Sequence, residues 1–515
     1  MAKHQLATRI VAVIDIGSTA VRMIVAEVNS EGQWWRLDRA ARPVGLGRDV
    51  FTSGAISRES MLQCIKILSS FTELLEGWGV TPDNIRTVAT SAIREARNRD
   101  TFIDRVQIRT GLQVNVIEGV EENHLTYLAV QNAINHMRPQ FTRSGSLILE
   151  VGGGTSELMV LNRGKMVSAH SLRVGTVRVR QQIRPGFDSA QQIREYLREN
   201  VRVTKEVLAA EFDLSRVRFF VAVGGEARLA ARKVGERKHE YYSIIRKRPF
   251  DEFIAGVQEM RMDELVDELG LSYYEVESLL PGLLLYKFFL EVTSADQLIV
   301  PDVSIREGVL ISFALGTSRA VEQQFYTQVI ASALSLGRKY HFDEAHARHV
   351  AEHALSLFDQ LAEEHGLDRH ARLLLEVAAL LHDIGNFVRS SGHHKHSQYL
   401  VANSEIFGFS REDIRIISNL VRYHRKVPPQ SSHPGFSSLR REHRLMVLKL
   451  GAILRIADAL DRSHSQRVRS VEAEVHEGDL LLHCEHSSDI QVESYGVDLK
   501  GDMFEQVYGY AVKIV

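Results

Sequence analysis

Apolar residues in the middle of the chain form two short blocks with a glycine-rich loop between them. The run from Leu147 to Val151 predicts a buried strand, and Leu158 to Leu161 predicts a second one. The loop between them contains Gly152-Gly153-Gly154. Glycines remove the Cβ atoms, and consecutive bare N–H groups in such a loop can bind an anion. Taken alone, the pattern fits an ordinary glycine-rich hairpin turn equally well.

A second copy of this pattern near the N-terminus favours the anion-binding interpretation. The apolar strand Ile10 to Ile16 carries an acid at Asp15, reaches Gly17-Ser18-Thr19, and resumes as an apolar strand. Two such hairpins indicate an internally duplicated fold that holds a phosphate between its halves. The predicted class is therefore α/β, with one phosphate loop in each half.

Carboxylates and hydroxyls accompany both glycine loops. Asp15, Glu150 and Glu157 are candidate ligands for a divalent metal that accompanies the phosphate, because hard cations prefer oxygen donors. Thr155 and Ser156 add hydroxyl donors to the central loop. The candidate phosphate-binding group is Gly17, Ser18, Thr19, Gly152, Gly153, Gly154, Thr155 and Ser156.

Other periodicities predict the surrounding elements. Apolar residues from Met61 to Leu75 recur at helical spacing, and Ser57 is a candidate cap for this helix. The pattern becomes helical again from Phe325. In the last fifty residues the helical pattern gives way to strand patterns, which predict a hairpin over 471–484 and a final strand over 510–515.

Composition excludes several classes of protein. The 515 residues are 44% hydrophobic and 25% charged, which is typical of a globular protein with three or four domains. The net charge of −2 provides no global field for nucleic acid. Cys64 and Cys484 form no disulfide framework, and no apolar run reaches the length of a membrane helix. We expect a cytoplasmic protein with neither a nucleic-acid nor a membrane partner.

Five further motifs follow one another in a fixed order. They are the segments 85–98, 114–125, 171–178, 219–228 and 301–310. Together with the two hairpins, they resemble the exopolyphosphatase/guanosine pentaphosphate phosphatase (Ppx/GppA) family of the actin-like phosphotransferase superfamily. The resemblance implies two actin-like, ribonuclease H-like halves and a Mg²⁺-dependent phosphoanhydride hydrolase. It implies polyphosphate as the substrate, with guanosine pentaphosphate (the pppGpp of the stringent response) or a non-catalytic phosphate sensor as alternatives. A homodimer is expected.

The same resemblance assigns roles to individual residues. Glu122 corresponds to the family's catalytic base, with Glu121 beside it in the catalytic group, and Arg94 corresponds to an arginine that contacts substrate phosphates. Two positions depart from the family pattern. Glu150 stands where the family usually has Asp, and Glu226 where a small hydroxyl residue is common.

Histidines are concentrated in the C-terminal part, where 17 of the 22 lie after residue 340. The adjacent His382-Asp383, followed by Asp458, resembles an HD domain, an all-α fold with a metal site. His346 is the preferred first ligand, with His349 and His353 as rivals. The resemblance implies a divalent ion, Mn²⁺, Fe²⁺ or Zn²⁺, and adds the hypothesis of a second ion. The predicted ligands are His346, His382, Asp383 and Asp458, with His396 and His424 for the second ion.

These patterns divide the chain into four predicted domains. They are an actin-like domain over 1–135, a second over 136–318, an HD-like helical domain over 319–465 and a small α+β tail over 466–515.

Overall fold

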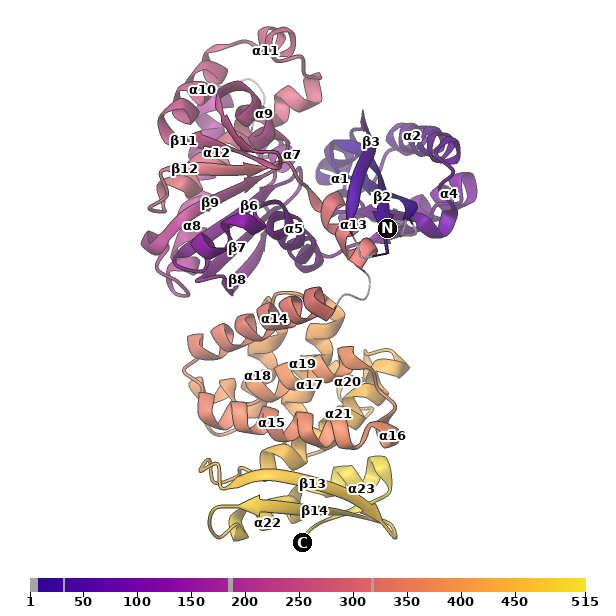
Figure 1. Ribbon diagram of the computed structural model, residues 1–515, viewed down its shortest axis with the longest axis vertical. Helices are drawn as coiled ribbons and strands as arrows, with labels where there is room; N and C mark the ends of the chain where they lie inside the picture. Colours follow the sequence, from indigo (N-terminus) through magenta and orange to yellow (C-terminus); the bar gives the residue numbers. More distant parts are fainter. Residues whose placement is uncertain (1–7, 31–32, 184–188, 316–318) are drawn as a thin grey trace, which may run out of the picture. The chain divides into compact units, whose positions relative to one another are not determined.

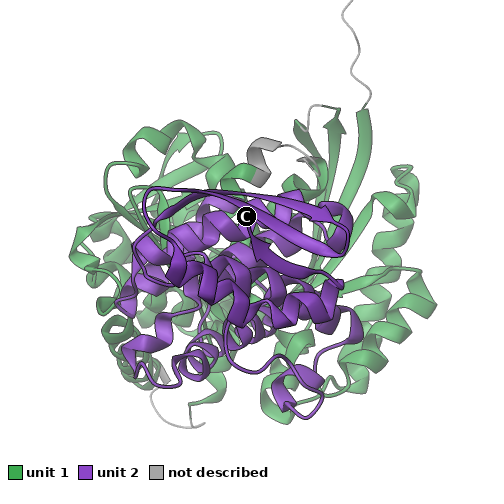
Figure 2. Cartoon of the chain, turned by 90° about the horizontal axis from the view of Figure 1, so that it is seen from below, with its two compact units in different colours: residues 1–325 green, residues 326–515 purple. Residues whose placement is uncertain are grey.

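The computed structural model of the chain describes residues 8–30, 33–183, 189–315 and 319–515. The chain forms two compact units, Met1–Phe325 and Tyr326–Val515 (Figure 2). The predicted domain boundary at residue 318 lies outside the described residues. Among the described residues, unit 1 contains two sheets and unit 2 contains one, and helices accompany all three.

Unit 1 begins with a five-stranded sheet in the order β3-β2-β1-β4-β5 (Figure 1). The first three strands are antiparallel neighbours, whereas β4 and β5 continue the sheet in parallel. Both faces of β1 and β2 are buried along most of their length, which explains why they appear in the sequence as continuous apolar runs. The strands are β1 (Thr8–Ile16), β2 (Ala20–Asn29), β3 (Trp34–Pro43), β4 (Ile85–Ala89) and β5 (Val114–Val116).

The second sheet of unit 1 repeats this topology. Its order is β10-β11-β12-β9-β6-β7-β8, so β8-β7-β6-β9-β12 has the same connectivity as the first sheet. Again three antiparallel strands are followed by two parallel ones. The predicted duplication is confirmed. The strands are β6 (Gly145–Val151), β7 (Ser156–Asn162), β8 (Lys165–Leu172), β9 (Val217–Val223), β10 (Glu236–His239), β11 (Tyr242–Arg246) and β12 (Gln297–Pro301).

Amphipathic helices cover these sheets. Ser57 caps α2, where its side chain accepts a hydrogen bond from the backbone N–H of Ser60, as predicted. Ser272 and Glu275 form a capping box at the start of α12. The helices are α1 (Leu46–Ser53), α2 (Arg58–Gly77), α3 (Ser91–Glu95), α4 (Arg99–Thr110), α5 (Gly119–Ala133), α6 (Arg138–Phe141), α7 (Thr176–Gln181), α8 (Ser189–Ala209), α9 (Gly225–Val234), α10 (Lys247–Glu259), α11 (Met262–Leu269), α12 (Tyr273–Glu291) and α13 (Ile305–Leu315).

The helix α13 returns to the first sheet after the second has been completed. It packs against α5 and β1, and Val309 and Leu310 share a hydrophobic core with Val11 and Val13. Gly308 permits this contact, because a Cβ there would lie 2.1 Å from the carbonyl oxygen of Leu125. The two predicted halves are therefore not consecutive in sequence, since α13 belongs with the first.

Unit 2 combines a helical part with a three-stranded sheet in the order β13-β14-β15. The predicted hairpin and final strand are confirmed as β13 (Val468–His476), β14 (Asp479–His486) and β15 (Ala511–Ile514). The helix α22 (Gln491–Lys500) was not predicted. The remaining helices are α14 (Arg319–Lys339), α15 (Glu344–Gln360), α16 (Ala362–His365), α17 (Arg369–Leu381), α18 (His393–Ala402), α19 (Arg411–Tyr423), α20 (Pro434–Ser437), α21 (Arg441–Ala459) and α23 (Asp502–Tyr508).

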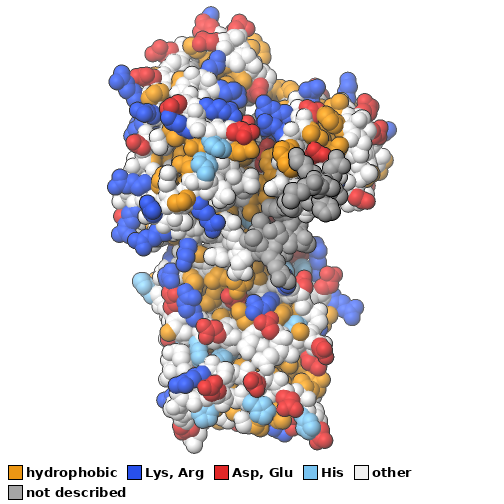
Figure 3. Space-filling model, viewed as in Figure 1, with side chains coloured by type: hydrophobic (Ala, Val, Ile, Leu, Met, Phe, Trp, Pro, Cys, Tyr) orange, Lys and Arg blue, Asp and Glu red, His pale blue; other side chains and the backbone are white. Residues whose placement is uncertain are grey.

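The surface carries both acidic and basic side chains on each unit, as the face in Figure 3 shows. This mixture agrees with the small net charge of the chain. Within the described ranges, no helix is both long enough and apolar enough to cross a membrane.

Candidate functional site

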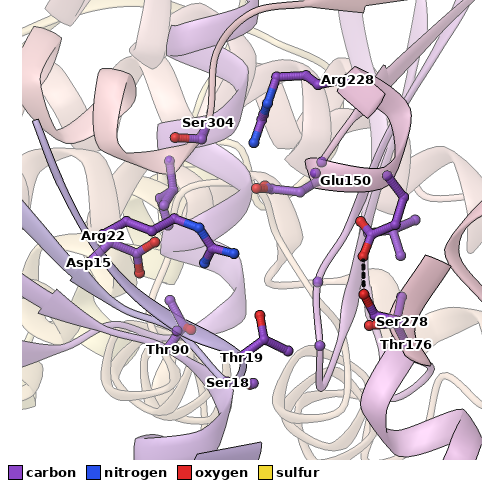
Figure 4. A pocket seen from close by; sticks show the side chains of 18 of the residues that line it. Asp15, Ser18, Thr19, Arg22, Thr90, Glu150, Thr176, Arg228, Ser278 and Ser304 are labelled. Atoms are coloured by element: carbon purple, nitrogen blue, oxygen red, sulfur yellow. Dashed lines mark hydrogen bonds between the residues drawn. The ribbon is translucent and has the colours of Figure 1, made fainter. Parts of the chain in front are cut away.

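A cavity of about 280 Å³ lies in unit 1 where the two glycine loops meet (Figure 4). Its walls come from both sheets and from the helices that follow them. Backbone, hydroxyl, carboxylate and guanidinium groups line it. The residues that line it include Asp15, Gly17, Ser18, Thr19, Arg22, Glu122, Glu150, Gly152, Gly153, Thr155, Glu157, Glu226, Arg228, Arg232, Ser278 and Arg306.

Backbone contacts bring the two loops together. A Cβ at Gly153 would lie 2.8 Å from the Cβ of Ser18, so only glycine permits this approach. Gly175 is equally restricted, because a Cβ there would lie 2.4 Å from the carbonyl carbon of Gly154. Arg178 donates a hydrogen bond to the carbonyl of Gly154 and forms an ion pair with Glu95, 2.7 Å away. The two predicted phosphate loops therefore form one surface of the cavity.

Two of the acidic residues in the cavity lie on equivalent strands of the two sheets. Asp15 lies near the end of β1, and Glu150 lies near the end of β6, at corresponding positions of the two sheets. Glu157 is the cross-strand partner of Glu150 on β7. Glu122 comes from the first turn of α5. The duplicated topology thus places one acidic strand end on each side of the cavity.

Removal from water changes the acidity of these groups. Burial raises the pKa of Asp15, of Glu122 and of Glu157, and raises the pKa of Glu150 to about 7. Their mutual repulsion acts in the same direction. Four clustered carboxyl groups of this kind favour the approach of a cation.

The hydrogen bonds distinguish the four acids. Glu157 accepts hydrogen bonds from Asn123 at 3.1 Å and from Ser171 at 2.8 Å, one on each carboxylate oxygen. Glu150 accepts one from Thr126. The Oδ1 atom of Asp15 is buried without a hydrogen-bond partner among the described residues. An unsatisfied buried carboxylate oxygen is costly unless a cation or donor meets it.

These donors fit a magnesium ion. Mg²⁺ usually takes only one or two protein carboxylates and fills its remaining positions with water and substrate phosphates. The unpartnered Asp15 oxygen and the carboxyl of Glu150 meet that requirement. Glu157, also predicted as a ligand, is already held by two hydrogen bonds.

Glu122 and Arg94 form an ion pair. Their Oε1 and Nη1 atoms lie 2.5 Å apart, and the same nitrogen donates to the carbonyl of Ile117. Both side chains are largely buried. Burial raises the pKa of Glu122 more than Arg94 lowers it. Arg94 is not among the residues that line the cavity, so in this structure it positions Glu122 instead of pointing at the space for phosphate.

Three other predicted residues lie outside the cavity lining. Glu121 is exposed, whereas its neighbour Glu122 is buried and lines the cavity. Ser156 is fully buried and donates its hydroxyl to the carbonyl of Val174. Gly154 packs against Phe51, whose ring would collide with a Cβ. Ser156 and Gly154 support the central loop instead of facing the cavity.

Four arginines line the cavity that were not predicted as site residues: Arg22, Arg228, Arg232 and Arg306. Arg22 is the cross-strand partner of Asp15, and Arg306 approaches the same acid closely enough to affect its pKa. Arginines suit phosphate oxygens because of their fixed fork of donors. Their positions in the sequence could have identified them, since each lies in or within a few residues of the first hairpin, the segment 219–228 or the segment 301–310.

Comparison with known proteins agrees with this geometry. The sequence profile of the Ppx/GppA phosphatase family matches residues 24–316, more than half of the chain. The chain belongs to the Ppx/GppA phosphatase family. A second profile, described as Ppx/GppA phosphatase, domain III, matches residues 330–491.

Two relatives of this Ppx/GppA phosphatase span most of its length. A protein of Vibrio atlanticus named guanosine-5'-triphosphate,3'-diphosphate pyrophosphatase is 26% identical over 86% of each chain. A protein of the same name from Aliivibrio fischeri is 24% identical over 86% of each chain. The crystal structure of an exopolyphosphatase from Cytophaga hutchinsonii covers 60% of this chain and 99% of its own, with a TM-score of 0.53 and 20% identity. This last likeness concerns the fold.

The second unit of this Ppx/GppA phosphatase contains a cluster of histidines and aspartates. His346, His382 and Asp458 offer ligand atoms within 4.8 Å of one another, and so do Asp383, His393 and His424. These side chains come from α15, from the ends of α17 and α19, and from α18 and α21. Five of the six predicted residues, His346, His382, Asp383, Asp458 and His424, therefore converge, and His393 joins them.

Two histidines that were considered for this cluster lie elsewhere. His353 is 3.0 Å from His349 and 3.1 Å from the carbonyl oxygen of Val468, so these rivals of His346 form a separate pair. The prediction of His396 is not supported, because His393, one turn earlier on α18, occupies that position. Gly385 allows the close packing of α18 that brings His393 in, since a Cβ at Gly385 would lie 2.2 Å from the His393 carbonyl oxygen.

Proposed function

We propose that this phosphatase removes the terminal phosphate from inorganic polyphosphate and releases orthophosphate. The observation that carries the proposal is a cavity in which two glycine loops, four arginines and the buried carboxylate of Glu122 face one space. Glycine N–H groups and guanidinium groups are suited to phosphate oxygens, and a buried carboxylate is suited to accept a proton. The membership of the chain in a phosphatase family supports the reaction class.

The proposed reaction assigns a role to each group. Glu122 accepts a proton from a water molecule while the oxygen of that water forms a bond to the terminal phosphorus. On the opposite side, the bond between this phosphorus and the bridging oxygen breaks, and the shortened polyphosphate leaves with the bridging oxygen. Arg94 holds Glu122 through its ion pair. Ser18, Thr19 and Thr155 and the loop N–H groups orient the phosphate. Asp15 and Glu150 would hold Mg²⁺, which when bound offsets the negative charge of the phosphates.

Guanosine pentaphosphate is the second candidate substrate, and two observations favour it. Two relatives that span 86% of the chain are named as enzymes of this nucleotide. One wall of the cavity is formed by Glu226 and Ser278, whose hydroxyl donates to the Glu226 carboxylate at 2.9 Å (Figure 4). A carboxylate can accept hydrogen bonds from ribose hydroxyls or guanine N–H groups, whereas it repels an additional phosphate.

Orthophosphate release from the two substrates under identical conditions tests the proposal. We expect release from long-chain polyphosphate in the presence of Mg²⁺ and none after chelation of the metal. A clear preference for guanosine pentaphosphate would replace the first candidate with the second. Binding of both ligands without any release would contradict hydrolysis and indicate a phosphate sensor.

The pKa of Glu150 predicts how the requirement for Mg²⁺ changes with pH. Burial raises this pKa to about 7, so the group is protonated below that value and cannot act as a metal ligand. The Mg²⁺ concentration for half-maximal kcat/KM should therefore rise by about tenfold for each pH unit below about 7, and level off above it. The measurement is a set of Mg²⁺ titrations across this range. A requirement that does not vary with pH would exclude Glu150 as a ligand.

A further inference from the structure

The cluster in unit 2 has a hydrogen-bonding arrangement that the phosphatase reaction does not use. In three histidines the Nδ1 atom lies within hydrogen-bond distance of a backbone carbonyl oxygen: Ala379 for His382 at 2.7 Å, Val421 for His424 at 2.8 Å and Ser390 for His393 at 3.0 Å. A carbonyl oxygen can only accept, so each Nδ1 atom carries the proton. In each neutral ring, the Nε2 atom therefore has a free lone pair.

His346 is oriented in the same way by a buried acid. Its Nδ1 atom lies 2.9 Å from Oδ2 of Asp461, which is fully buried and also accepts hydrogen bonds from Gln466. A histidine whose second nitrogen is held by a carboxylate or a carbonyl is the usual arrangement around protein-bound metals. All four imidazoles of the cluster have it.

The four Nε2 atoms form two close pairs. Those of His346 and His382 are 3.2 Å apart, and those of His393 and His424 are 3.3 Å apart. Two facing lone pairs repel one another unless a cation or a proton lies between them. Ligand atoms about 2.1 Å from one metal ion are about 3.0–3.5 Å apart in octahedral or tetrahedral coordination. The observed separations match the edges of such a polyhedron.

An aspartate oxygen lies close to each pair of Nε2 atoms. Oδ1 of Asp458 lies 3.6 Å from Nε2 of His346 and 3.7 Å from Nε2 of His382. Oδ1 of Asp383 lies 3.0 Å from Nε2 of His393, 3.5 Å from Nε2 of His424 and 3.7 Å from Nε2 of His382. Asp383 is therefore shared between both groups of histidines.

Two cations flank the cluster, one beside Asp458 and one beside His393. Lys500 from α22 forms an ion pair with Oδ2 of Asp458, the oxygen that does not face the histidines. Arg425 lies beside the ring of His393, with Nη1 3.3 Å from Nε2.

We propose that unit 2 holds a pair of divalent transition-metal ions in this cluster. His346, His382 and Asp458 bind the first ion, His393 and His424 bind the second, and Asp383 bridges the two. The mixture of imidazole and carboxylate donors suits Mn²⁺, Fe²⁺ or Zn²⁺ and does not suit Mg²⁺. Asp461 and the three backbone carbonyls position the imidazoles. The pair connects five helices of unit 2, so it also stabilises their packing.

Metal analysis of the full-length chain, reconstituted with Mn²⁺ and freed of loosely bound ions, tests the proposal. We expect about two ions per chain in the wild type, one in His393→Gln and none in the double variant His382→Gln/Asp383→Asn. The matched control is His394→Gln, which changes the neighbouring histidine on α18 and should retain both ions. Equal metal content in all four proteins, or none in the wild type, would overturn the proposal.

Electron paramagnetic resonance gives a second readout, and its wild-type signal does not depend on how well any variant folds. Two Mn²⁺ ions about 4 Å apart are magnetically coupled, whereas a single ion gives an uncoupled six-line signal. The wild type and His394→Gln should show the coupled signal, and His393→Gln the uncoupled one. An uncoupled signal in the wild type would contradict a bridged pair. Because the unit 1 residues are unchanged in these variants, failure of this inference leaves the proposed phosphatase reaction unaffected.

Discussion

Replacing Glu122 with Gln should reduce kcat for orthophosphate release by about 10²-fold or more while leaving KM within a few-fold of the wild type. Gln preserves the size of the side chain but cannot accept a proton from water. It can still accept a hydrogen bond from Arg94, so the local packing is retained. The measurement is steady-state kinetics with polyphosphate and with guanosine pentaphosphate.

Glu121→Gln is the matched control for this prediction. It is the same chemical change one residue earlier on α5, but Glu121 is exposed and does not line the cavity. We expect its kcat to remain within about twofold of the wild type, since surface substitutions away from a site have small effects. If Glu121→Gln lost activity and Glu122→Gln kept it, the assignment of the base would be wrong.

Replacing Asp15 with Asn should also reduce turnover by about 10²-fold and raise the Mg²⁺ concentration needed for activity. The buried, unpartnered Oδ1 atom of Asp15 is the best available protein ligand in the cavity. Asn keeps the shape of the side chain but removes the negative charge. Kinetics at increasing Mg²⁺ concentrations would measure both effects.

The same substitution should stabilise the ligand-free protein. Burial raises the pKa of Asp15, so its carboxylate destabilises the folded state as pH rises above the pKa of the unfolded chain. Without Mg²⁺, Asp15→Asn should raise the Tm near neutral pH, and the gain should vanish under acidic conditions, where the wild-type carboxyl is protonated. Asp100→Asn is the control, because that side chain is 90% exposed. A lower Tm for Asp15→Asn near neutral pH would show that the carboxylate is stabilised by protein contacts instead of being left for a cation.

The sequence alone determined the two hairpins, the duplication and the acids at the ends of β1 and β6. These features depend on local periodicity and on glycine, which act over a few residues. The resemblance to a family supplied Glu122 and Arg94, but their direct ion pair was not predicted. Pairing between residues 28 positions apart depends on how α3 and α5 pack.

Only the tertiary structure decided which side chains share a site. The residue pattern by itself did not separate Glu122 from Glu121, because neighbouring residues on a helix differ only in the face they present, and the choice of Glu122 came from the family resemblance. It also did not separate His393 from His396, since residues three apart lie on almost the same helix face. The close packing of Gly385 against α18 selects His393. Likewise, no local pattern could show that α13 returns to the first sheet, because that contact joins residues far apart in the chain. Local propensity specifies elements, whereas the direction of a side chain follows from packing between them.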